Sequence, residues 1–132
     1  MDKAFHQIHI IDDNEVDTYI SEHLIEELGI SEKISSSTNG QDALDYLTGL
    51  GIEQPDIVFL DVRMPVMGGF EFLEKYSEFL IDKPKKPKIY MLTSSSDPFD
   101  VEKAGINPLV RKYFSKPLSP EILQKLKEGE YT

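Results

Sequence analysis

The sequence contains no cysteine among its 132 residues. A chain without cysteine has neither a disulfide framework nor a zinc site built from thiolates. Its length is that of one domain and is sufficient to bury a hydrophobic core. The lack of cysteine agrees with the cytoplasm, the compartment that we expect, although exported proteins without cysteine also exist.

Long hydrophobic runs are also missing. No apolar run approaches the length of a membrane-spanning helix, and the N-terminal MDKAFHQIHI lacks the hydrophobic segment of a signal peptide. We therefore expect no association with a membrane.

Basic residues are scarce, with 14 Lys and Arg against 24 Asp and Glu, which gives a net charge of −10. Such a surface repels the phosphates of nucleic acids and of anionic lipids, so direct binding of nucleic acid is not expected. The only basic cluster is KPKKPK (83–88), which is short and interrupted by prolines. We interpret it as an extended, solubilising connector rather than a nucleic-acid patch or a docking element.

What the sequence does contain is an alternation of short apolar runs with helical patterns, each pair separated by polar or glycine-rich turns. The apolar runs predict five strands, at 8–11, 33–37, 55–60, 88–93 and 110–114. A helical pattern follows each of them. Strands that alternate with helices predict an α/β fold, in which a parallel sheet is covered on both faces.

Apolar residues recur at helical spacing in the predicted helices, and two of these helices serve as examples. The first carries apolar residues at a spacing of four, namely Val16, Ile20, Leu24 and Leu28. In the short helix that Pro98 opens, we expect Val101 and Ala104 to point inward.

Polar side chains follow the predicted strands at the points where these end. Asp12 and Asp13 follow the first strand, Asp61 the third, Thr93 ends the fourth, and the fifth leads to Lys116. In open α/β sheets, ligands bind beyond the carboxyl ends of the strands. Crowded carboxylates repel one another and so require a cation, and all-oxygen ligands suit Mg²⁺ or Mn²⁺ better than zinc.

The same grouping predicts phosphoryl chemistry at Asp61. A divalent cation, a lysine and a hydroxyl around one carboxylate form a receptor for the three oxygens of a phosphoryl group. The carboxylate can then act as the nucleophile and form an acyl phosphate.

Four motifs in order resemble the signatures of the receiver domain of two-component response regulators. They are IIDDN (10–14), FLDVRMPVMGG (59–69), MLTSSSD (91–97) and KYFSKPL (112–118). The resemblance extends from about residue 7 to 128. It implies a doubly wound, flavodoxin-like (βα)5 fold with a five-stranded parallel sheet in the order 2-1-3-4-5.

The resemblance also implies roles for the acidic residues. Asp61 is the expected phosphoacceptor and is also expected to be one of the metal ligands. Asp13 is expected to bind Mg²⁺ directly, Asp12 through water, and Arg63 through its backbone carbonyl. Pro65 and the two glycines at 68–69 then shape the loop that presents this carbonyl.

For the switch, the resemblance implies that the Thr93 hydroxyl and the Ser94 backbone N–H bind phosphoryl oxygens, while Lys116 pairs with the phosphoryl group. The bond before Pro117 is expected to be cis. Tyr113 is expected to turn inward when the threonine moves, although simple packing is the competing interpretation.

Two positions tune the lifetime of the acyl phosphate in this family, and here they are Arg63 and Ser95. The arginine can shield Asp61 from water, or it can pair with an acidic neighbour and have no effect. We expect the Arg63→Ala substitution to change the rate of hydrolysis.

The predicted function is that of a stand-alone response regulator, a single receiver domain over residues 1–132 without an output domain. It would receive a phosphoryl group from a sensor histidine kinase or a histidine phosphotransfer protein. It would then signal by protein contact through the face of the fourth helix, fifth strand and fifth helix. Its own phosphorylation and slow dephosphorylation would be its only catalysis, so we do not expect an enzyme.

Three alternatives remain at this point. The chain can be a receiver excised from a longer regulator or hybrid kinase. It can be an aspartyl-phosphate phosphatase on a related fold, although such enzymes usually need a second acid where Arg63 stands and a cap insertion. It can also be a pseudo-receiver that only binds. The histidines at 6, 9 and 23 are interpreted as structural.

Overall fold

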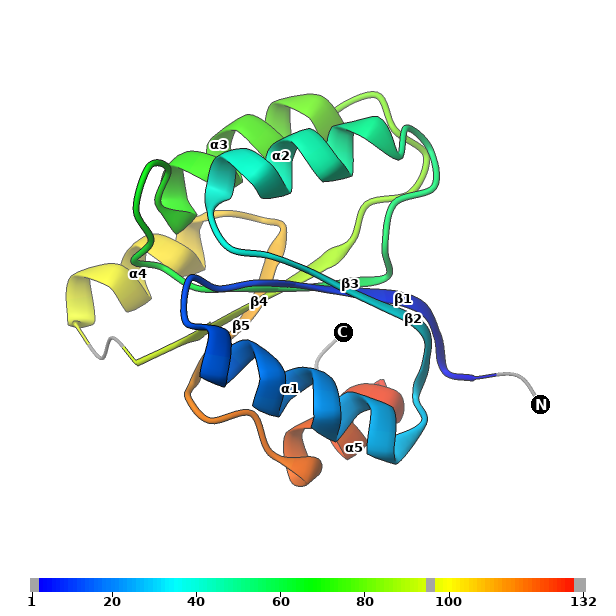
Figure 1. Cartoon of the computed structure of the whole chain (residues 1–132). Helices are drawn as coiled ribbons and strands as arrows, with labels where there is room; N and C mark the ends of the chain where they lie inside the picture. Colours follow the sequence, from blue (N-terminus) through cyan, green and yellow to red (C-terminus); the bar gives the residue numbers. More distant parts are fainter. Residues whose placement is uncertain (1–2, 95–96, 130–132) are drawn as a thin grey trace.

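The computed structural model describes residues 3–94 and 97–129. Within them five strands alternate with five helices (Figure 1). The elements are β1 (Phe5–Ile11), α1 (Glu15–Leu28), β2 (Ser31–Ser37), α2 (Gly40–Gly49), β3 (Ile57–Leu60), α3 (Gly69–Leu80), β4 (Lys88–Thr93), α4 (Pro98–Ile106), β5 (Val110–Ser115) and α5 (Pro120–Lys127).

The strands form one parallel sheet in the order β2-β1-β3-β4-β5. Helices α2, α3 and α4 cover one face, and α1 and α5 cover the other (Figure 1). This confirms the predicted fold class and strand order. In the described part of the chain, no helix combines the length and apolar character needed to cross a bilayer.

The central strand β3 shows how the sheet separates two cores. All four of its residues are buried. Because successive side chains of a strand point to opposite faces, Val58 and Leu60 join the cluster under α2, α3 and α4, whereas Ile57 and Phe59 join the cluster under α1 and α5. Fully burying such a side chain stabilises the fold by about 1.5–3 kcal/mol.

Polar caps start the helices directly after the strand ends. The side chains of Asn14, Asn39 and Ser119 each accept a hydrogen bond from the backbone N–H three residues later. Asp97 caps α4 in a similar way, through the N–H of Phe99. The links to these four helices are short, whereas α3 has no side-chain cap and follows β3 after a longer loop, from Asp61 to Gly68.

Only part of the apolar pattern predicted for α1 packs against the core. Val16 is 67% exposed, Ile20 46% and Leu28 38%, while Leu24 packs at the core margin. Residues four apart in an α-helix are turned by about 40° from one another, so a series at that spacing leaves the buried stripe. The buried residues of α1 are Ser21 and Ile25.

Helix α4 also differs from the prediction. Ala104 is buried as expected, but Val101 is 43% exposed. The other buried residue of this helix is the acidic Asp100. A carboxylate can be buried there because it has a cationic partner from another part of the chain, described below.

Candidate functional site

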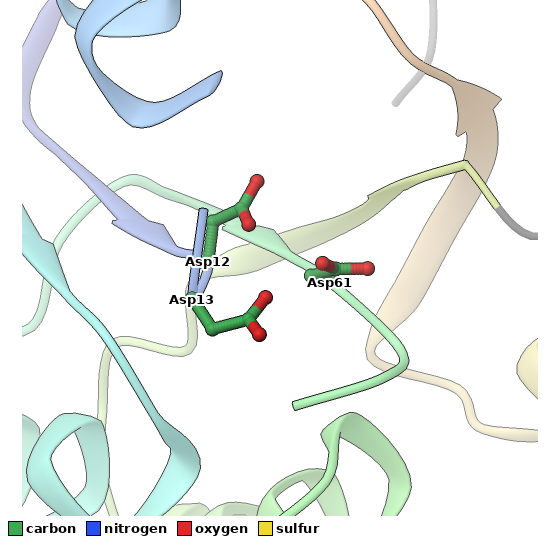
Figure 2. A group of neighbouring side chains, drawn as sticks. All are labelled: Asp12, Asp13 and Asp61. Atoms are coloured by element: carbon green, nitrogen blue, oxygen red, sulfur yellow. The ribbon is translucent and has the colours of Figure 1, made fainter. Parts of the chain in front are cut away.

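Three carboxylates meet beyond the ends of β1 and β3. These strands pair in parallel with Ile11 opposite Leu60, so the residues that follow them, Asp12 and Asp61, are neighbours. Oxygens of Asp12, Asp13 and Asp61 lie within 4.8 Å of one another (Figure 2). The prediction that these three come together is confirmed.

Burial distinguishes the three acids. Asp12 and Asp61 are only 4% and 6% exposed, whereas Asp13 is exposed. Backbone N–H groups hold the buried pair: Asn14 donates to Asp12 Oδ1 at 2.9 Å, and Val62 donates to Asp61 Oδ1 at 2.7 Å. The second oxygen of each buried carboxylate is directed toward a lysine.

That lysine is Lys116, which follows β5 and was predicted to reach this site. Its Nζ lies 2.7 Å from Asp12, 3.0 Å from Asp17 and 3.3 Å from Asp61. Burial alone would lower the pKa of Lys116, but hydrogen bonds to Asp12 and Asp17 and the charges around it hold that pKa above its ordinary value. The lysine is therefore charged and shared among the carboxylates.

The pKa of Asp12 is raised even beside this lysine. Burial is the largest cause, and the charge of Asp61 adds to it, while hydrogen bonds from Lys116 and Asn14 oppose the shift. Since the acids outnumber the ammonium group, the site has an excess of negative charge.

Asp17 was missed from the sequence. It lies in the first turn of α1, where Asn14 accepts a hydrogen bond from its backbone N–H at 3.0 Å, and its side chain is 38% exposed. Its place three residues after a helix cap at the end of β1 is the signal that would have found it. An acidic residue in the first turn of that helix lies at the same edge of the sheet as the aspartates.

The loop after Asp61 is folded tightly against the end of β3. Gly69 begins α3 so close to this strand that a side chain there would collide with the carbonyl oxygen of Asp61. The Gly69 N–H donates to the Val62 carbonyl at 2.8 Å. The loop that contains Arg63 is thus held at the site, and the Arg63 carbonyl as a metal ligand stays a prediction.

The side chain of Arg63 pairs with the start of α4. Its Nη2 lies 2.9 Å from Asp100 and 3.8 Å from Asp97. The Asp100 side chain is 9% exposed and that of Arg63 is 67% exposed. Of the two arrangements considered for this arginine, the structure shows the pairing with an acidic neighbour.

The remaining site residues lie on β4 and β5. Thr93 ends β4 and is buried, and Ser94 follows it at the surface. Tyr113 is half-buried against the core under α3 and α4. The Lys116–Pro117 bond is cis, as the resemblance implied. Ser95 lies outside the described residues.

The donor set fits a small, hard cation. It consists of carboxylate oxygens alone, two of the three groups are buried, and they lie close enough to bind one ion. Such a set suits Mg²⁺ and does not suit a soft or thiophilic metal.

Together, the doubly wound sheet and the acidic cluster with its lysine define a flavodoxin-like domain of the CheY type. The family model described as the response regulator receiver domain matches residues 8–127. The chain therefore belongs to the receiver domain family of response regulators.

Individual relatives support this family assignment. The chain is 35% identical to the probable methanogenesis regulatory protein FilR2 of Methanothrix harundinacea over 90% of this chain and 77% of the relative. It is 36% identical to an uncharacterized response regulatory protein of Vibrio cholerae, over 70% of this chain and 31% of that longer protein. A two component response regulator from Cytophaga hutchinsonii superposes with a TM-score of 0.87 at 27% identity, covering 98% of both chains.

Proposed function

We propose that Asp61 accepts a phosphoryl group from a phosphohistidine, in a reaction that depends on Mg²⁺. The observation that carries this proposal is the position of Asp61, whose carboxylate is buried between two further aspartates and a charged lysine. The donor would be a sensor histidine kinase or a histidine phosphotransfer protein.

In the proposed step, a carboxylate oxygen of Asp61 attacks phosphorus, the P–N bond to histidine breaks, and the imidazole nitrogen keeps the electron pair. Asp12, Asp13 and the Arg63 carbonyl would hold the ion, which supplies positive charge next to the transferring oxygens. The Val62 N–H, 2.7 Å from Asp61 Oδ1, fixes the orientation of the carboxylate.

Lys116 would change partners in this reaction. It now contacts Asp12, Asp17 and Asp61, and its ammonium group would pair with the phosphoryl oxygens. The Thr93 hydroxyl and the Ser94 N–H would bind the other oxygens. Ser95, together with Arg63, would set the lifetime of the product.

The proposed output follows from the same movement. Displacement of Thr93 would let Tyr113 turn inward and alter the surface of α4, β5 and α5, which is a two-state switch biased by a local charge. We further propose a cytoplasmic regulator that acts alone and signals through a protein partner. The alternative, a receiver within a longer regulator, is favoured by the Vibrio cholerae relative, of which the chain spans 31%.

The test compares the wild type with Asp61→Asn. Each protein is incubated with acetyl phosphate and Mg²⁺, and its intact mass is measured. We expect the wild type to gain one phosphoryl group and the variant to gain none. Beryllofluoride with Mg²⁺ should shift the amide NMR signals around Thr93 and Tyr113 in the wild type alone. A wild type that changes in neither measurement refutes the phosphoacceptor role.

A further inference from the structure

The surface between α3 and α4 carries a groove that has no lining residue in common with the acidic cluster. Two adjoining hollows, of about 620 and about 470 Å³, share Ser77, Ile81, Asn107 and Pro108. The groove runs along α3 from Phe70 in its first turn to Ile81 just past its end, and beside Lys103 and Ile106 of α4. Asp12, Asp13, Asp61 and Lys116 do not line it. It is therefore separate from the proposed phosphorylation site.

Large apolar side chains form the two walls. Ile81, directly after α3, is 75% exposed, and Ile106, the last residue of α4, is 77% exposed. Leu73 and Pro108 continue the apolar lining between them. Exposed apolar side chains that gather around a hollow mark an interaction site more often than single exposed residues do.

Hydrogen bonds keep the floor of the groove in shape. The Asn107 side chain donates to the Ser77 hydroxyl at 3.4 Å and accepts from the Leu109 N–H at 2.9 Å. The Ser77 hydroxyl in turn donates to the Leu73 carbonyl at 2.6 Å. These bonds join α3 to the segment between α4 and β5, so the groove exists before any partner arrives.

One end of the groove is basic, because the 83–88 segment borders it. Two of the lysines in this segment are neutralised: Lys83 lies 2.8 Å from Asp82, and Lys85 lies 2.7 Å from Asp56. Lys86 donates instead to the Lys83 carbonyl at 2.9 Å and lines the groove. The segment is thus held by specific contacts, which our interpretation as an extended connector did not foresee.

Arg111 supplies the second cation at this end. It occupies an irregularity of β5. The consecutive residues Ile89 and Tyr90 of β4 pair with Val110 and Lys112, so Arg111 is an extra residue with no opposite residue on β4. A bulge of this kind redirects a side chain, and Arg111 lines the groove beside Leu109. Within residues 3–94 and 97–129, neither Lys86 nor Arg111 makes an ion pair.

We propose that this groove binds a segment of a partner protein in which apolar residues are followed by carboxylates. The apolar residues would lie between Ile81 and Ile106, and the carboxylates would pair with Lys86 and Arg111. Glu74 and Glu78 line the other hollow together with one cation, Lys103, so its net charge is negative and it favours the segment in this direction.

The charge of the chain favours another protein over a second copy. With a net charge of −10, two copies repel each other, whereas these two cations form a local site of the opposite sign. The proposal is independent of phosphorylation at Asp61 and remains testable if that role fails.

The probe is a random linear-peptide display library, selected on the wild type and counter-selected on a Lys86→Glu/Arg111→Glu variant. Both substitutions are at the surface, so the variant should fold, which its amide NMR spectrum checks. Lys3→Glu/Lys127→Glu, at two exposed lysines outside the groove, is the matched charge control. Ile106→Ser tests the apolar wall, and Ile52→Ser, at an isoleucine that is 64% exposed elsewhere, is its control.

We expect selected peptides to combine Leu, Ile or Phe with Asp or Glu, and to shift the amide signals of Ser77, Ile81 and Asn107. The double charge reversal and Ile106→Ser should each weaken binding about tenfold, while both controls retain it. A peptide with lysine in place of its acids should prefer the double variant.

Three results would overturn the proposal. One is the enrichment of peptides without an acidic residue. Another is binding that the charge reversals leave unchanged or that maps to a different face. The last is self-association of the wild type that Ile106→Ser removes in sedimentation measurements, because the groove would then be an interface between copies.

Discussion

His9 lies in β1, and Asp12 directly follows this strand. Both side chains are polar and buried, but the charge balance around them is opposite. The ring nitrogens of His9 lie 2.7 Å from the Ser35 hydroxyl and 2.8 Å from the Ser37 hydroxyl, and the ring stacks on Tyr46. A neutral imidazole has one donor and one acceptor, and each has a hydroxyl partner here. The region around His9 is satisfied and neutral.

Asp12 lies three residues further on, in a region that is not balanced. It shares the single ammonium group of Lys116 with Asp17 and Asp61, and Asp13 adds another carboxylate. The comparison shows that one strand can bury polar side chains either to stabilise the fold or to build a reactive site. The difference is whether the partners within the chain are sufficient or a further cation is needed.

The largest effect should come from Lys116→Met. Loss of this ammonium leaves the buried carboxylates without their cationic partner, and we expect the unfolding free energy to fall by about 3–5 kcal/mol in metal-free urea titrations. Mg²⁺ should restore part of it. The control, Lys125→Met, removes an exposed pair with Glu121 and should cost less than about 0.5 kcal/mol. Equal losses would contradict the contrast between the regions.

The next effect concerns pH and His9. Burial lowers the pKa of His9 from 6.5 to about 4, so between these values the unfolded chain binds more protons than the folded one. The contribution of His9 to stability is complete above pH 6.5 and is lost as the pH falls toward 4, in total about 3 kcal/mol.

Urea titrations across this range should therefore show a weaker pH dependence for His9→Gln than for the wild type. The exposed His23 provides the matched control, and His23→Gln should keep the slope of the wild type. Parallel curves for His9→Gln and wild type would show that this imidazole does not titrate as argued.

Binding of Mg²⁺ should stabilise the acidic region by a smaller amount. At a concentration about 30 times the dissociation constant, the ion would add about 2 kcal/mol to the unfolding free energy of the wild type. Asp13→Ala should remove most of this gain and, without metal, should be neutral or slightly stabilising because repulsion falls. Glu26→Ala, at an exposed acid of α1, should respond to Mg²⁺ like the wild type.

The smallest effect is expected at the Arg63–Asp100 pair. Since Arg63 is 67% exposed, the pair should contribute only about 0.5 kcal/mol. If the activation free energy of hydrolysis changes by the same amount, the hydrolysis rate of the phosphorylated protein, measured by phosphate release, should change about twofold. Arg63→Ala and Asp100→Asn should both show it, and the double variant should show no further change. Additive effects would mean that the two residues act separately.

The sequence was sufficient for the parts of the fold and site that depend on chain order. Apolar runs predicted the strands, and because neighbouring parallel strands end at one edge, Asp12, Asp13, Asp61 and Lys116 could be placed together from the sequence alone. The strand β1 nevertheless begins at Phe5, earlier than predicted, because pairing with β2 extends it through polar residues.

The parts that failed depend on how elements pack. Asp17 reaches Lys116 only because of the position of α1 over the site, and the partner of Arg63 lies 37 residues away on α4. A local sequence pattern predicts neither of these two contacts. The exposure of Val101 and the burial of Asp100 have one cause. The ion pair with Arg63 turns Asp100 inward, and its neighbour Val101 is then exposed.

The irregularity at Arg111 also affects the solubility of the protein. β5 is an edge strand, and a regular edge offers its backbone groups to a strand of any other molecule. The bulge interrupts the spacing of those groups, and the consecutive residues Arg111 and Lys112 are both exposed and positively charged. A second β5 would meet both the mismatch and the like charges, which protects this edge against aggregation through added strands.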